Sequence, residues 1–120
     1  MQVTSLLTEK KLITHAIIFD KNKAVIKPAS LPFTNQLVAF LKSNAAIRLY
    51  IDGHTDSDGT ADANVKLSQS RAEAIKKKLT SLGIDPGRLQ TRGLGATQPV
   101  ETNATPEGMA QNRRVEFVKQ

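Results

Sequence analysis

The stretch from Ile47 to Gly83, IRLYIDGHTDSDGTADANVKLSQSRAEAIKKKLTSLG, joins a short strand, a polar loop and a long helix. In residues 47–52, apolar side chains alternate with polar or charged ones, the period of two expected of a strand with one buried face. In residues 67–82, apolar side chains recur every three to five positions and predict an amphipathic helix. Gly83 offers a left-handed C-cap for that helix, so this unit decides the centre of the fold.

Further elements are predicted on both sides of this unit. Residues 15–19 are apolar and rich in isoleucine, which predicts a strand, and the apolar stripe that starts at Ser30 predicts a helix ending near Asn44. Residues 88–94 and 115–118 predict two more strands, separated by a turn-rich stretch. The resulting βαβαββ order predicts an α/β fold of the α+β sandwich type: a mixed sheet with helices packed on one face, joined by right-handed crossovers.

Length and composition indicate one globular domain. The chain has 120 residues, of which 39% are apolar and 23% charged, and its apolar runs are far shorter than the roughly 20 residues that cross a bilayer. Cysteine is absent from the sequence, which excludes thiolate catalysis, cysteine-ligated metal sites and disulfides. We expect the domain to span residues 15–120 and leave residues 1–14 as an unassigned leader or linker.

The net charge of +6 favours a polyanionic partner such as nucleic acid. The positive residues are scattered, however, and the one dense run, residues 76–78, spreads over nearly a full helical turn, as expected of a solvated face. Aromatic residues make up only 4% of the chain, and the four phenylalanines occupy core-like positions, which leaves few rings for stacking on bases. We therefore expect no nucleic-acid partner.

The polar loop after the first secure strand is the candidate binding site, because crevices at strand ends commonly hold ligands. Asp56 lies in this loop, and Arg71 lies in the following helix beside its apolar stripe. One interpretation is structural: Arg71 extends past the core edge and pairs with Asp56. The other is functional: Asp56 binds the ammonium, and Arg71 the carboxylate, of a zwitterionic ligand. Spacing alone leaves both open.

Two sequence blocks resemble the OmpA-like C-terminal domain family. The first is GHTD at residues 53–56 followed by NxxLSxxRAxxI at residues 64–75. The second ends with NRRVE at residues 112–116. Residues that agree in order and spacing before that ending are Gly93, Gly95, Pro99, Asn103 and Gly108. Together the blocks cover about residues 17–117.

The resemblance implies a periplasmic domain of an outer-membrane or cell-envelope protein that binds peptidoglycan noncovalently, without catalysis, cofactor or metal. It implies that Asp56 and Arg71 hold the diaminopimelate of the stem peptide, and that the domain thereby anchors its parent protein to the cell wall. Membrane contact is expected only through segments absent from this sequence. By analogy, the residues that complete the site are Phe19, Asp20, Thr55, Asn64, Leu67 and Arg113.

A metal hydrolase is the first competing interpretation, since four aspartates and His54 lie between residues 52 and 62. If Gly59 is aligned with the glycine of a calcium loop, His54 takes the first ligand position and Val65 the last, where Asp and Glu are required. We therefore predict no metal site, and we expect His54 to hydrogen-bond to the neighbouring backbone and shape the loop.

The closing motif allows two interpretations of its arginines. In the structural interpretation, one arginine braces the loop after the helix predicted at residues 67–82, while the other faces solvent on an edge strand. In the functional interpretation, Arg113 contacts the ligand. Met109 stands where many relatives place an arginine, so a contact made by that side chain elsewhere is not expected here.

Overall fold

The computed structural model describes residues 3–120. Within this range the chain forms four strands and three α-helices, with short 3-10 helices at Val3–Leu7, Pro28–Ser30 and Pro86–Arg88. The strands and α-helices follow in the order β1 (Lys11–Thr14), α1 (Leu31–Ser43), β2 (Leu49–His54), α2 (Ala61–Ser81), β3 (Leu89–Gly95), α3 (Pro106–Asn112) and β4 (Arg114–Lys119).

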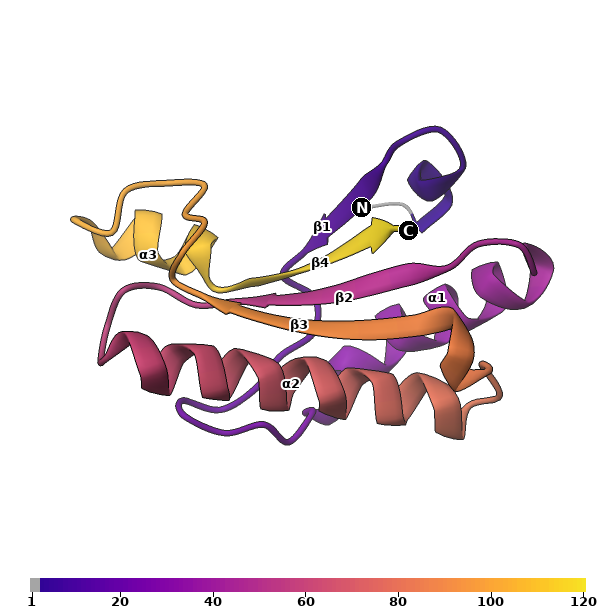
Figure 1. Ribbon diagram of the computed structural model, residues 1–120, viewed down its shortest axis with the longest axis horizontal. Coiled ribbons are helices and arrows are strands. Elements are labelled where there is room, and N and C mark those ends of the chain that lie inside the picture. The colour runs from indigo at the N-terminus through magenta and orange to yellow at the C-terminus, as the bar shows by residue number, and fades with distance from the viewer. Residues whose placement is uncertain (1–2) are drawn as a thin grey trace.

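The strands form one mixed sheet in the order β1-β4-β2-β3. Strands β2 and β3 are parallel, whereas β4 runs antiparallel to both of its neighbours, β1 and β2. Helices α1 and α2 cover the same face of the sheet (Figure 1). The predicted mixed sheet with helices on one face is therefore confirmed. Since β4 lies inside the sheet, the interpretation in which one arginine of the closing motif faces solvent on an edge strand is wrong: Arg114, which begins β4, is buried.

The core lies between this sheet and the two long helices. Ile51 of β2 pairs with Phe117 of β4, and both are fully buried because their side chains project toward the helices. Phe117 stacks on Phe33 of α1, with ring centroids 6.0 Å apart, while Ile75 and Leu79 close the core from α2. Burying these side chains supplies the main driving force for the fold.

Two glycines allow α2 to approach the sheet unusually closely. A Cβ atom on Gly53 would lie 2.5 Å from the carbonyl oxygen of Ser68, and one on Gly93 would lie 2.5 Å from the backbone nitrogen of Gln69. Any side chain at either position would push the helix away. This contact sets the height of α2 above the sheet, and with it the position of Arg71, one turn further along the helix.

The first strand does not lie where the sequence predicts it. Residues 15–19 form a loop, and the strand is Lys11–Thr14, paired antiparallel with β4. Residues 15–19 look strand-like because Ile17 is buried in the core without joining the sheet, whereas Leu12 and Thr14 are the buried positions of the true strand. Apolar content reports burial and not backbone pairing.

The folded unit reaches further toward the N-terminus than the predicted boundary at residue 15. Leu6 is fully buried in the core and Val3 nearly so. Met1 and Gln2, which belong to the same predicted leader or linker, lie outside the described residues. Within residues 3–120, no helix is long and apolar enough to cross a membrane.

The predicted ends of the two long helices are confirmed. Helix α1 ends at Ser43, and α2 ends just before Gly83, whose φ of +107° is the left-handed conformation that glycine adopts easily. Helix α3 was not predicted, because its seven residues carry no apolar stripe. It begins at a cap in which the Thr105 hydroxyl accepts a hydrogen bond from the Gly108 backbone at 3.0 Å.

Candidate ligand-binding site

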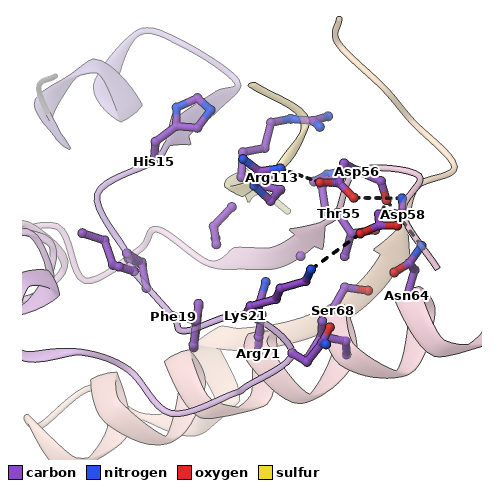
Figure 2. Close-up of a pocket in the computed structure, with 18 of the residues that line it drawn as sticks. His15, Phe19, Lys21, Thr55, Asp56, Asp58, Asn64, Ser68, Arg71 and Arg113 are labelled. Atoms are coloured by element: carbon purple, nitrogen blue, oxygen red, sulfur yellow. Dashed lines mark hydrogen bonds and ion pairs between the residues drawn. The ribbon is translucent and has the colours of Figure 1, made fainter. Parts of the chain in front are cut away.

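A cavity of about 550 Å³ lies at the end of β2 and the start of β4, between α2 and the loop that follows β1. Figure 2 shows the side chains that converge on it. The charged side chains lining this cavity, apart from histidines, are Lys21, Asp56, Asp58, Arg71, Arg113 and Arg114.

Asp56 is a buried carboxylate fixed from two sides. Asp56 is only 8% exposed, and its Oδ1 accepts a hydrogen bond of 2.9 Å from the backbone N–H of Asp58. Its Oδ2 accepts a hydrogen bond of 2.5 Å from Nη1 of Arg113 (Figure 2). Charge-assisted bonds of this kind fix the orientation of a carboxylate. Asp56 is therefore a preorganised acceptor for a cation.

Arg71 extends from α2 to the same cavity, where it links the helix to the loop after β1 by hydrogen bonds. Its Nε donates to the Lys23 carbonyl at 2.8 Å and its Nη2 to the Asp20 carbonyl at 3.1 Å. The guanidinium also lies over the Phe19 ring, 4.8 Å from the centroid, a cation–π arrangement. The interpretation in which Arg71 pairs with Asp56 is wrong, because the partner of Asp56 is Arg113.

The charge state of Arg71 reflects these surroundings. Burial, and next the positive charge of Arg113, lower the pKa of Arg71 below its ordinary value. Arginine side chains in proteins are effectively always protonated, so Arg71 carries its positive charge at neutral pH. Both guanidinium groups belong to residues that line the cavity.

Four of the other predicted site residues line the cavity: Phe19, Thr55, Asn64 and Leu67. Thr55 and Asn64 support the loop, since the Thr55 hydroxyl and the Asn64 Nδ2 donate to the Asp56 carbonyl at 2.8 and 3.4 Å. Asp20 is placed differently. Its carboxylate is exposed and pairs with Lys27 at 2.8 Å. Asp20 contributes to the site through its backbone carbonyl, which accepts a hydrogen bond from Arg71.

Several other residues that line the cavity were not among the predicted site residues. Lys21 lies at its mouth, where its Nζ is 3.9 Å from Oδ2 of Asp58, and both side chains are largely exposed. Met109 also contributes, although it departs from the family pattern. These residues come from irregular loops and from α3, where no periodic pattern reports which side chains face inward.

His54 lies at the end of β2, where it lines the cavity and belongs to a buried polar cluster. Among residues 3–120, neither of its ring nitrogens has a hydrogen-bond partner, so the predicted bond to neighbouring backbone is not formed. Its Nε2 lies 3.8 Å from Oε2 of Glu116. Burial, followed by the positive charge of Arg114, lowers the pKa of His54, which keeps the ring neutral at pH 7.

The cluster around His54 is balanced by an ionised carboxylate. Burial of Glu116 alone would raise its pKa, but hydrogen bonds from Arg114 at 2.7 Å and Lys11 at 3.1 Å outweigh burial and lower it. Asp52 projects from the same face of the sheet and forms a two-pronged ion pair with Arg92. The acidic residues near the loop thus have separate partners, and in residues 3–120 no group of three His, Cys, Asp or Glu converges to hold a metal.

The chain is similar to several envelope proteins. Residues 18–113 match the model of the OmpA family. The probable lipoprotein YiaD of Escherichia coli is 40% identical over 101 residues, covering 84% of this chain and 46% of YiaD. The peptidoglycan-binding protein ArfA of Mycobacterium tuberculosis is 38% identical over 102 residues, covering 85% of this chain and 31% of ArfA. The chain therefore spans less than half the length of these two relatives.

The fold agrees with this sequence similarity. The crystal structure of the peptidoglycan-associated lipoprotein from Burkholderia pseudomallei matches with a TM-score of 0.80 at 30% identity, covering 95% of this chain and 92% of that one. With the family model covering most of the sequence and a solved structure reproducing the fold, this chain belongs to the OmpA family.

Proposed function

We propose that this domain binds peptidoglycan noncovalently through the diaminopimelate of the stem peptide, and that it anchors an outer-membrane or cell-envelope protein to the wall from the periplasm. The observation that carries the proposal is that Asp56 and Arg71 line one cavity without pairing to each other. A carboxylate and a guanidinium held apart by different partners remain available to a ligand that carries both opposite charges.

Diaminopimelate has this chemistry at the end of its side chain. One carbon bears both an ammonium and a carboxylate, so Asp56 can accept hydrogen bonds from the ammonium while Arg71 donates to the carboxylate. Two nitrogens of Arg71 hold backbone carbonyls, and among residues 3–120 its Nη1 has no hydrogen-bond partner. Lysine at the same stem position lacks the carboxylate, and amidation neutralises it. Both changes should weaken binding.

The surrounding residues support a binding role without requiring catalysis. Thr55 and Asn64 fix the loop that carries Asp56, and Phe19 and Leu67 provide apolar contact surface for the methylene chain of diaminopimelate. Asp20 acts through its carbonyl on Arg71, and Arg113 through its ion pair with Asp56. Similarity to a relative that is itself named a peptidoglycan-binding protein also supports the partner. Noncovalent binding of this kind needs no nucleophile, metal or cofactor.

The test is co-sedimentation of the folded domain with insoluble peptidoglycan. The wild type and the Asp56→Asn and Arg71→Gln variants are mixed with walls that contain diaminopimelate or, separately, lysine. Asp62→Asn is the matched control, because Asp62 is an exposed carboxylate at the start of α2 that does not line the cavity. Circular dichroism verifies that each variant folds.

We expect the wild type and Asp62→Asn to pellet only with the diaminopimelate wall. Removing one partner of a buried charge pair costs about 2–5 kcal/mol, so Asp56→Asn and Arg71→Gln should each bind at least about 30-fold more weakly. If the wild type pellets with neither wall, the binding proposal fails. Equal pelleting with both walls would instead rule out diaminopimelate as the recognised residue.

A further inference from the structure

The cationic side chains of the cavity differ in whether a carboxylate balances them. Lys21 lies opposite Asp58, Arg114 is paired with Glu116, and Arg113 is paired with Asp56. Arg71 forms no ion pair with any carboxylate in residues 3–120 and instead donates to two backbone carbonyls. Before any ligand arrives, the cavity thus carries one unbalanced positive charge.

Binding of a ligand ammonium to Asp56 would create a second unbalanced charge. Asp56 is the one buried carboxylate among the charged cavity-lining residues in the range 3–120, and one of its oxygens already accepts from the Asp58 backbone. A ligand ammonium must therefore share the Asp56 carboxylate with Arg113 or displace Arg113 from it. The Arg113 side chain is 50% exposed, and within residues 3–120 it makes one hydrogen bond, to Asp56, so it is free to turn toward a new partner.

Diaminopimelate can offer one carboxylate or two, depending on where the stem peptide ends. When the stem stops at diaminopimelate, both carboxylates are free, together with the side-chain ammonium. When a D-alanine follows, one of those carboxylates becomes an amide, and the free carboxylate moves to the next residue, roughly 3.8 Å further along the chain. The two stems carry the same net charge and differ only in where the second carboxylate lies.

We propose that this cavity prefers the stem tripeptide that ends at diaminopimelate, and that Arg113 sets this preference by taking the second carboxylate when the ligand ammonium occupies Asp56. The inference rests on the proposed function. The guanidiniums of Arg71 and Arg113 and the carboxylate of Asp56 match a ligand with two carboxylates and one ammonium, so each of these charges keeps an opposite partner. The longer stem leaves Arg113 opposite a neutral amide.

The experiment measures binding of two soluble muropeptides by isothermal titration calorimetry. One is the disaccharide tripeptide ending in diaminopimelate, and the other is the disaccharide tetrapeptide with one further D-alanine. Their equal net charge removes long-range attraction as an explanation for any difference. The proteins are the wild type, Arg113→Gln and Lys77→Gln, the last removing one positive charge from an exposed position on α2 outside the cavity.

We expect the wild type and Lys77→Gln to bind the tripeptide about tenfold more tightly than the tetrapeptide, a modest factor because Arg113 is half-exposed. Arg113→Gln should bind the two with affinities within about twofold of each other. Equal wild-type affinities for both muropeptides would overturn the inference and leave the proposed function intact, as would a preference that survives in Arg113→Gln. Binding of neither muropeptide by the wild type would refute the proposed function itself.

Discussion

Replacing Gly53 with alanine should destabilise the domain through one steric contact. The new Cβ would lie 2.5 Å from the carbonyl oxygen of Ser68, whereas ordinary van der Waals contact begins near 3.4 Å. The strand and the helix would have to separate by almost 1 Å, and because the opposing atom belongs to the backbone, no side-chain rotation relieves the clash. Overpacking of this kind costs about 1–3 kcal/mol, and a rigid contact belongs at the upper end of that range.

An opposing effect reduces the net loss. Alanine restricts the unfolded chain more than glycine does, which favours folding by about 0.4–1 kcal/mol where the backbone conformation is compatible. We therefore expect Gly53→Ala to lower the free energy of unfolding by about 2 kcal/mol. For a domain of this size that corresponds to a fall in melting temperature of roughly 8 °C.

Gly87→Ala is the matched control. Its Cβ would lie 3.4 Å from Oδ1 of Asp85, an ordinary contact with a side chain that can move, so its stability should stay within about 0.5 kcal/mol of the wild type. Urea denaturation followed by circular dichroism compares the two variants. If Gly53→Ala unfolds at the same urea concentration as Gly87→Ala, the close contact between α2 and the sheet does not constrain the fold as argued.

Two further predictions concern pH and helix capping. Burial, aided by the positive charge of Arg114, lowers the pKa of His54 in the folded state. Near pH 6.5 the unfolded chain therefore binds a proton at His54 that the folded state does not bind. The free energy of unfolding should fall as the pH drops from 7.5 to 5. Urea titrations at each pH should show a weaker fall in His54→Asn and an unchanged fall in His15→Asn, a control at an exposed position. If the free energy of unfolding depends on pH equally in both variants, His54 is not the group responsible. Thr60→Ala removes the side-chain cap that accepts from the Ala63 backbone at 3.1 Å, which should cost about 1 kcal/mol, and an unchanged urea midpoint would show that this cap contributes nothing.

The candidate site was predicted in part from sequence. The loop after β2 and the arginine of α2 were placed in one crevice, and the structure brings Asp56 and Arg71 to the same cavity. Their partners were not predictable, because Arg113 and the carbonyl of Lys23 are 57 and 48 residues away along the chain. The hydrogen bond expected for His54 also failed, since its surroundings come from β4 and not from its own loop.

The sequence by itself determined the elements whose signals are local. The two long helices and strands β2, β3 and β4 were located within a few residues, because a strand alternates its faces every two residues and a helix returns to one face about every 3.6. Gly83 likewise marked the end of α2, because a glycine readily adopts the left-handed conformation that terminates a helix. These signals are complete within a single stretch of chain.

Tertiary structure decided what depends on contacts between distant stretches. Whether residues 11–14 or 15–19 form the first strand is decided by pairing with β4, about 100 residues further along the chain. Tertiary packing also decides that Asp56 pairs with Arg113, and that Arg71 donates to backbone carbonyls instead. Hydrogen bonds and ion pairs form between groups that folding brings together, and the spacing of residues along the chain does not record which groups those are.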